Sequence, residues 1–254
     1  MNKKQDTPLI EIEDIGDKDY LTRPTDQLLE DFGAGNHIPG SGSAAILSAL
    51  LGIEMLRTVI KLTLDKDEYQ AVHEAFKLNL DTLENTYKPR LMELFNSDVK
   101  EFHLVSYHRR KRDQAEGNED DEKFNYHKKE ALEQLRKATE IPMEVYRISN
   151  TLMRIAFTTF DNGFRATRGD SGVAISNLLS ALSGSFYVLF LNLKSFKRGN
   201  WKNEKQIESI ELLGRFRELQ RQAYSRVINL YNKSSIESGT QQLLLFEETP
   251  PNRR

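Results

Sequence analysis

The stretch from Ser171 to Leu193 contains no charged residue, although 29% of the chain is charged. As a helix it is long enough to cross a bilayer. Its serines and asparagines, however, lie around the whole circumference of such a helix instead of along one side. This distribution favours the central helix of a bundle over a membrane span, and we expect no membrane association. Such a helix requires other helices packed around it.

Helical periodicity covers most of the remaining chain. Only 7 prolines and 14 glycines interrupt the 254 residues, which favours long elements. Short links between the periodic stretches favour antiparallel neighbours, so the sequence predicts an all-α fold, an antiparallel bundle of six to seven helices. Besides a short helix over about 26–32, the expected helices cover about 43–64, 67–95 with a break at Pro89, 97–112, 120–139, 142–160, 171–196 and 204–233.

We expect three regions along the chain. Residues 1–25 form an extended N-terminal arm, residues 26–233 form one helical domain, and residues 234–254 form a flexible, polar C-terminal tail. No internal repeat or low-complexity stretch divides the central region. The helices are therefore expected to share one core.

The composition argues against several classes of function. Lysines and arginines (36) nearly balance aspartates and glutamates (38), so we expect no direct nucleic-acid binding. The absence of cysteine excludes disulfides, thiolate zinc sites and a cysteine nucleophile, and it is typical of a cytoplasmic protein. The histidines show neither HExxH nor HxxxH spacing, so we predict no metal site.

The turn Pro39-Gly40-Ser41-Gly42-Ser43 directly precedes the first long helix. Its glycines let a ligand approach the main chain, and its serines add hydroxyl groups. The helix start offers free N–H groups and the positive end of the helix dipole. Together these features predict a site for a carboxylate, a phosphate or a developing negative charge. The alternative is an ordinary loop and helix cap, with glycine present for close helix packing.

Three further features each have a functional and a structural interpretation. Asp170 lies at a helix start, where it would either bind a cationic substrate or cap the helix. His37 is either an acid–base group or a structural or solvated loop residue. The basic run Arg109–Arg112 is expected to end a helix, where positive charges interact favourably with the helix dipole. We favour this interpretation over a binding site for an anionic tail or a nucleic acid.

Several short motifs, taken in order, resemble those of the cyclodeaminase/cyclohydrolase family of folate proteins. Members have a short helix, a Pro-Gly-Gly-Gly-Ser turn and an Ala-rich helix, then an Asp-x-x-x-Phe pair, an Ala-Thr-x-x-Pro-x-x-Val segment and a Ser-Asp-x-Gly-Val-Ala segment. The similarity covers about residues 26 to 197. The matching segments are Asp26–Leu29, Pro39–Ala45, Asp98 with Phe102, Ala138–Val145, Gly169–Ala174 and Asn192-Leu193.

The resemblance implies an all-helical homodimer that binds a tetrahydrofolate. Such a protein either cyclises 5-formiminotetrahydrofolate with loss of ammonia or hydrolyses 5,10-methenyltetrahydrofolate, with no metal or redox cofactor. It assigns Asp170 as the catalytic carboxylate, suited to hold the cationic methenyl bridge. The substrate-binding residues that it implies are Pro39, Gly40, Ser41, Gly42, Ser43, Asp98, Lys111, Gly172 and Asn192.

The chain departs from the family pattern at several of these positions. Ser41 replaces the middle glycine of the turn, and Gly169 replaces the serine before Asp170. The family's Leu-Pro-Lys segment is replaced by basic residues, which leaves Lys111 or Arg112 as its substitute. A relative that binds a folate without turning it over is therefore an alternative.

The C-terminal tail contains an apolar cluster that resembles the peptide by which bacterial replication and repair proteins dock on the sliding clamp. An exposed Leu-Phe pair on a polar tail favours a partner groove, or it folds back onto the bundle or a dimer mate. The alternative function is therefore an inactive helical adaptor or ligand sensor that docks on the clamp. The predicted partner-binding residues are Gln242, Leu243, Leu245 and Phe246.

Overall fold

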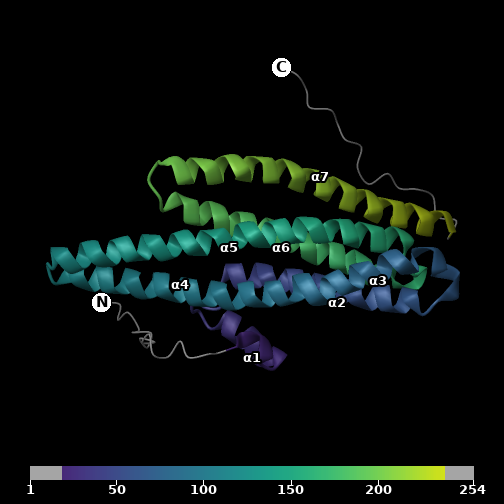
Figure 1. Cartoon of the computed structure of the whole chain (residues 1–254), viewed down its shortest axis with the longest axis horizontal. Coiled ribbons are helices and arrows are strands. Elements are labelled where there is room, and N and C mark those ends of the chain that lie inside the picture. The colour runs from purple at the N-terminus through teal and green to yellow at the C-terminus, as the bar shows by residue number, and fades with distance from the viewer. Residues whose placement is uncertain (1–18, 238–254) are drawn as a thin grey trace, which may run out of the picture.

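The computed structural model describes residues 19–237, and every regular element within them is a helix, which confirms the all-α prediction (Figure 1). Most of the predicted arm and the tail from residue 238 lie outside the described residues, and so do the predicted clamp-binding residues Gln242, Leu243, Leu245 and Phe246. The elements are η2 (Tyr20–Thr22), α1 (Thr25–Gly33), α2 (Ser41–Leu64), η3 (Asp67–Val72), α3 (His73–Thr82), the π-helix η4 (Leu83–Tyr87), α4 (Lys88–Gly117), α5 (Asp121–Asn162), η5 (Arg165–Thr167), α6 (Arg168–Lys194) and α7 (Asn200–Glu237).

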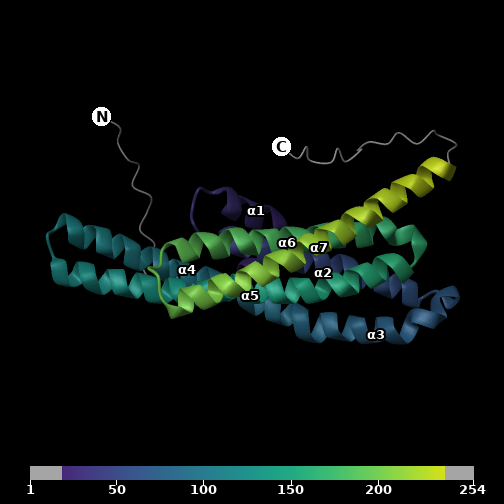
Figure 2. The same ribbon diagram turned by 90° about the horizontal axis from the view of Figure 1, so that it is seen from above.

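Helices α2 and α6 pack closely against each other and run antiparallel (Figures 1 and 2). A Cβ added at Gly184 would lie 3.0 Å from the Ala45 side chain, and one added at Gly52 would lie 3.0 Å from Leu178. Small residues at these two levels allow the helix backbones to approach each other. The long α4–α5 hairpin covers the other side of this pair and completes the core.

The two prolines differ in their effect on the helices. The expected break at Pro89 is present, because the π-helix η4 ends just before it and Pro89 lies in the first turn of α4, where its missing N–H is tolerated. The new helix expected at residue 97 is absent, because α4 continues through that position. Pro142 lies inside α5, which continues through it. A mid-helix proline costs about 3 kcal/mol, and burial of its neighbours Ile141 and Met143 in the core offsets this cost.

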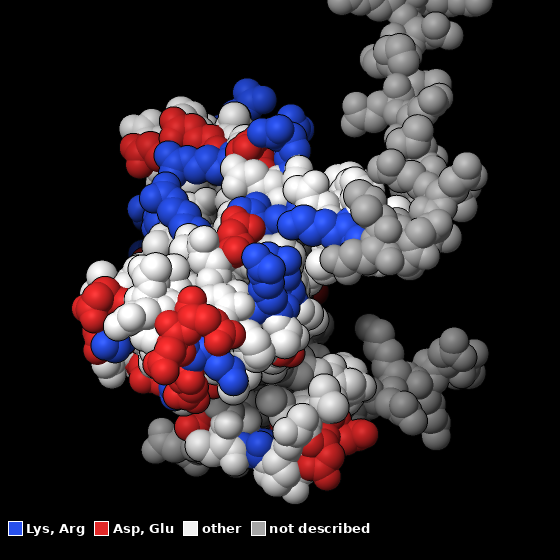
Figure 3. Space-filling view, turned by 90° about the vertical axis from the view of Figure 1, so that its right-hand side faces the viewer, with Lys and Arg blue, Asp and Glu red and all other residues white. Residues whose placement is uncertain are grey.

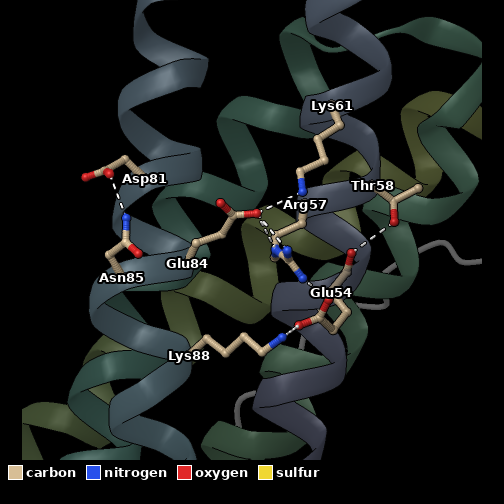
Figure 4. Close-up of polar contacts among 8 residues, drawn as sticks. All are labelled: Glu54, Arg57, Thr58, Lys61, Asp81, Glu84, Asn85 and Lys88. Atoms are coloured by element: carbon tan, nitrogen blue, oxygen red, sulfur yellow. Dashed lines mark hydrogen bonds and ion pairs between the residues drawn. The ribbon is translucent and has the colours of Figure 1, made fainter.

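Charged side chains join α2 to η4 and the start of α4 (Figure 4). Arg57 Nη2 and Lys61 Nζ lie 2.7 Å and 2.9 Å from Glu84 Oε1, and Lys88 Nζ lies 2.8 Å from Glu54 Oε1. Hydrogen bonds from Lys61 and Arg57 lower the pKa of Glu84. Burial opposes the shift at Glu54, but hydrogen bonds from Lys88 and Arg57 lower its pKa as well. These side chains form a paired network that holds the helices in register.

Helix α7 lies across α5 and α6 (Figures 1 and 2). The Tyr146 hydroxyl donates a hydrogen bond of 2.6 Å to the carbonyl oxygen of Leu212, and burial raises the pKa of Tyr146 to about 12. The Phe186 ring of α6 contacts both Tyr146 and Phe216. At the end of the bundle near α3, basic and acidic side chains both reach the surface (Figure 3).

The exposed sides of α2 and α6 form a surface without charged residues, which we call the outer face. By length and composition, α2 and the span Arg165–Lys194 are apolar enough to cross a membrane, and 56% and 44% of their most apolar windows are buried in this structure. Charge appears only at the two ends of the α6 stripe, with Asp170 and Lys194. The outer face consists of Ala44, Leu51, Thr58 and Leu62 from α2, and Val173, Ser176, Ser180, Tyr187 and Leu191 from α6.

Candidate functional site

The predicted glycine turn lies against α4, and Asp98 makes the contact. The Asp98 carboxylate occupies the space beside Gly42, because a Cβ added there would lie 2.2 Å from Oδ1. Ser43 Oγ donates a hydrogen bond of 2.7 Å to Oδ2, and the Ser43 backbone N–H donates to the same carboxylate. The group at this helix start is therefore a carboxylate of the chain itself. Asp98 lies within α4, whereas the sequence predicts it near the beginning of a helix over 97–112.

Asp98 is only 8% exposed. Desolvation by burial raises the pKa of Asp98 above its ordinary value of 3.8, although the two hydrogen bonds from Ser43 act in the opposite direction. Within residues 19–237, no lysine or arginine forms an ion pair with this carboxyl group. A carboxyl group in this state exchanges its proton closer to neutral pH, as general acid–base catalysis requires.

Two other polar side chains of α4 have buried atoms: Glu101, three residues after Asp98 on the same face of the helix, and His103, five residues after it on another face. Glu101 Oε2 and His103 Nε2 have no hydrogen-bond partner among the described residues. Burial and then the charge of Arg110 lower the pKa of His103, which favours the neutral ring. The ring of His37 lies edge-on to Phe102, with 6.4 Å between the centroids. Buried polar atoms without a partner point to water or a ligand beside the middle of α4.

Asp170 and Gly172 lie far from the turn within one chain. Asp170 is in the first turn of α6 but does not cap it, because Thr167 holds the cap position. Helix α6 runs antiparallel to α2, and Gly184 of α6 lies beside Ala45, close to the turn. Asp170 precedes Gly184 along α6, so it lies about 20 Å from the turn at a rise of about 1.5 Å per residue. The turn and Asp170, which the resemblance assigns to one substrate site, therefore do not meet inside a single chain.

The structure also separates Lys111 from the turn. The basic run Arg109–Arg112 does not end a helix as predicted, because α4 continues beyond it. Lys111 Nζ lies 5.7 Å from the Tyr107 ring centroid, about 20 Å along α4 from Asp98 at a rise of about 1.5 Å per residue. Asn192 is buried near the end of α6, at the same end of the bundle as the turn.

The histidines make one close contact between helices. His108 Nδ1 of α4 and His127 Nδ1 of α5 lie 3.0 Å apart and share a hydrogen bond. Within residues 19–237, no three His, Asp or Glu side chains are grouped to hold a metal ion. Sequence spacing does not reveal the histidine pair, because its members come from different helices.

A known protein family matches most of the chain. The model of the formiminotransferase-cyclodeaminase family matches residues 24–209. The chain belongs to this family. The matched range contains the glycine turn, Asp98 and Asp170, and it ends inside α7. The second half of α7 lies beyond it.

Two relatives in the formiminotransferase-cyclodeaminase family are folate proteins. Methenyltetrahydrofolate cyclohydrolase of Methylorubrum extorquens is 26% identical over 196 residues, which cover 76% of this chain and 90% of that protein. The crystal structure of formiminotetrahydrofolate cyclodeaminase from Thermotoga maritima matches with a TM-score of 0.69 and 15% identity, over 83% of this chain and 98% of that one. The first relative supports folate cyclohydrolase or cyclodeaminase chemistry at the level of the family, and the second shows the shared fold.

Sequence reasoning found the turn and Asp98 but assigned them different roles. It treated the turn as open to a ligand, whereas Gly42 and Ser43 hold the Asp98 carboxylate. It missed Glu101 and His103, whose buried atoms lack partners. The spacing of Asp98 and Glu101, three residues apart on one helical face, is the signal that would have found Glu101.

Proposed function

We propose that this protein hydrolyses 5,10-methenyltetrahydrofolate and that Asp98 transfers the proton. The observation that carries the proposal is the buried Asp98 carboxyl group against Gly42 and Ser43, with its raised pKa. The cyclohydrolase relative supports the choice of substrate. The buried Oε2 atom of Glu101, which lacks a partner and lies on the same face of α4 as Asp98, provides a further polar contact.

The proposed reaction needs one group that accepts a proton and then returns it. The methenyl carbon shares a positive charge with its two nitrogens, so water attacks it readily. As the C–O bond forms, the ionised Asp98 takes one proton from the water. Asp98 then gives this proton to N5 as the C–N5 bond breaks, and the hydroxyl proton leaves to solvent, which yields the 10-formyl product. A raised pKa favours the return step, and no metal or redox cofactor takes part.

We also propose that the protein forms a homodimer through the outer face. This surface carries Tyr187 and Leu191 at 79% and 65% exposure, and exposed uncharged faces of this extent are typical of surfaces covered by another protein. The outer face is also self-complementary. When two copies of α6 cross antiparallel about their middle, Asp170 of one copy meets Lys194 of the other, and Val173 meets Leu191.

This pairing of two copies would also bring Asp170 of one copy towards the turn of the other. The end of α6 that carries Lys194 lies at the end of the bundle where α2 begins. Asp170 of a second copy therefore approaches the turn of the first, where the side chain of Ser41 is exposed. In this arrangement each site uses Asp98 and Ser41 from one copy and Asp170 from the other.

Loss of methenyltetrahydrofolate absorbance on addition of pure protein tests the activity. We expect turnover above the buffer rate, and a drop of at least about 100-fold in Asp98→Asn, the usual size of a lost general base. Asp81→Asn is the matched control, because Asp81 is an exposed carboxylate on α3 that bonds Asn85. A rate equal to buffer would contradict the proposal. Release of ammonia from 5-formiminotetrahydrofolate, measured in parallel, would indicate the cyclodeaminase reaction instead.

Mixing two inactive variants tests the shared site. Asp98→Asn and Asp170→Asn are each expected to be inactive alone. After the subunits are exchanged in equal amounts, about a quarter of the wild-type activity should return, because half of the dimers then contain one intact site. No recovery, with subunit exchange verified by a tag, would place both residues in the same chain's site.

A further inference from the structure

The described surface has a cavity of about 350 Å³ between α5 and the turn that leads from α6 into α7. Its walls come from the first half of α5 and from residues 196–202, and none of its lining residues belongs to α2 or α4. It is therefore separate from the site around Asp98. The residues that matter for its chemistry are Lys129, Arg136, Phe196, Lys197, Trp201 and Lys202.

The charge of the cavity lining is unbalanced. Four cations line it, at Lys129, Arg136, Lys197 and Lys202, against one acid, Glu133. In the part of the chain that the structure describes, none of these four cations forms an ion pair, whereas other cations between helices are paired. Cations gathered without a counter-charge repel one another, and a bound anion would relieve this repulsion.

Glu140, an acid outside the cavity lining that contacts Trp201, already has a cation as its partner. Glu140 Oε2 lies 2.6 Å from Lys205 Nζ, and Glu140 Oε1 accepts a hydrogen bond of 3.2 Å from Trp201 Nε1. This leaves Glu140 engaged with its own partners rather than with the cations of the cavity. Glu140 therefore does not neutralise the excess of cations in the cavity lining.

Contacts within the wall fix its shape. The Arg136 guanidinium carbon lies 5.0 Å from the centroid of the Trp201 ring, and the Phe196 ring lies 4.8 Å from Trp201. Lys202 Nζ donates a hydrogen bond of 2.7 Å to the carbonyl oxygen of Phe196. The aromatic pair and these cations are thus positioned before any ligand arrives, which reduces the entropy cost of binding.

We propose that this cavity binds a phosphorylated small molecule of about the size of a mononucleotide. Its volume is within the range of about 300–1,000 Å³ that small-molecule sites occupy. Lysine ammonium groups act as point charges from several directions, which suits the doubly charged, tetrahedral phosphate better than a planar carboxylate. Leu132, Phe196 and Trp201 offer apolar contact to the rest of the molecule.

Calorimetric titration of the full chain with AMP, ATP and inorganic pyrophosphate tests this proposal, with triglutamate as the carboxylate probe. We expect saturable binding of at least one phosphate compound and weaker binding of triglutamate. Lys197→Ala combined with Lys202→Ala should weaken binding by at least about tenfold, because two charge-assisted contacts are lost. Lys100→Ala combined with Lys137→Ala removes the same charge from exposed positions outside the cavity, and it should change binding less than about twofold.

Several outcomes would overturn the proposal. They are the absence of binding at millimolar phosphate compound, equal weakening by the two double variants, and triglutamate binding as tightly as ATP. Binding of pyrophosphate as tight as that of ATP would support a site for the phosphates alone, and tighter binding of AMP or ATP would support a nucleotide site. Thermal unfolding of each variant identifies any that fails to fold. Such a variant is then replaced by Lys197→Arg, which keeps the charge and should retain binding. Failure of this test leaves the proposed hydrolysis untouched, because the two sites share no residue.

Discussion

Carboxylates lie against α2 at two places, and their surroundings are opposite. Glu54 and Glu84 are partly exposed and each contacts two cations, and the pKa of each is lowered (Figure 4). Asp98 of α4, which lies against the start of α2, is buried, has only the hydroxyl and amide of Ser43 as described partners, and has a raised pKa. The paired carboxylates serve to hold helices together, whereas the buried one is poised to exchange a proton.

Among changes that test the difference between the buried and the paired carboxylates, Gly42→Ala should have the largest effect. The new methyl group would overlap Asp98 Oδ1, so either the carboxylate or α4 must move. We expect a loss of about 3 kcal/mol in the free energy of unfolding, at the upper end for overpacking, together with loss of the proposed activity. Denaturant unfolding measures the first effect. Gly214→Ala, in the interior of α7 with no atom within 4 Å of the added Cβ, should instead gain about 0.5–1 kcal/mol. Equal effects at the two glycines would show that Asp98 does not press on the turn.

Asp98→Asn isolates the carboxyl group while keeping its shape. Its predicted effect is a fall of at least about 100-fold in the rate constant of methenyltetrahydrofolate hydrolysis, with the fold retained by circular dichroism. Glu54→Gln, on the same helix pair, should leave the rate within about twofold because that carboxylate only pairs with cations. Comparable losses of hydrolysis rate in the two variants would show that the buried Asp98 has no special part in the reaction.

The pH dependence of stability should have opposite signs at the two places. Because the pKa of Asp98 is raised on folding, its contribution makes the free energy of unfolding fall as pH rises above 3.8 and level off above the raised pKa. The lowered pKa of Glu54 gives stability that is complete above about 4.5 and is lost as pH falls through the folded value. Unfolding curves from pH 3 to 8 for the wild type, Asp98→Asn and Glu54→Gln measure both. A parallel profile for the wild type and Asp98→Asn would show that folding does not shift the pKa of this group.

The smallest effect is expected from Glu84→Gln. Arg57 and Lys61 lose a shared partner, but all three side chains are partly exposed and solvent screens their attraction. We expect a slight fall in melting temperature at low salt and no difference from the wild type at about 1 M salt, where the Debye length is about 3 Å. A large fall that persists at high salt would mean that the network contributes as much as the buried core.

The helices were predictable where apolar periodicity was long, and their ends were not. The uncharged run that became α6 and the small-residue start of α2 both gave the expected core helices. Pro142 misled the prediction, because tertiary burial outweighs the local cost of a proline inside α5. The end of α4 was predicted too early, because a basic run is compatible with a helix interior as well as with a helix end.

The sequence indicated the turn and Asp98 of the candidate site, but not their contact with each other. Glycine and serine before a helix indicated an anion site, yet the sequence cannot say that the anion is Asp98, from another helix. Likewise, spacing along the chain does not show that Asp170 and the turn lie at opposite ends of an antiparallel pair. Such distances depend on how helices are oriented in the fold, which no single helical pattern contains.

The outer face determines how the proposed assembly should respond to its surroundings. Apart from its two ends, it has no charge for ions to screen, so added salt should barely loosen a pair held through it. Attraction between apolar surfaces weakens on cooling, so chilling should loosen it. A cold, dilute sample would then contain single subunits whose Asp170 has no neighbouring turn, and its activity should return on warming.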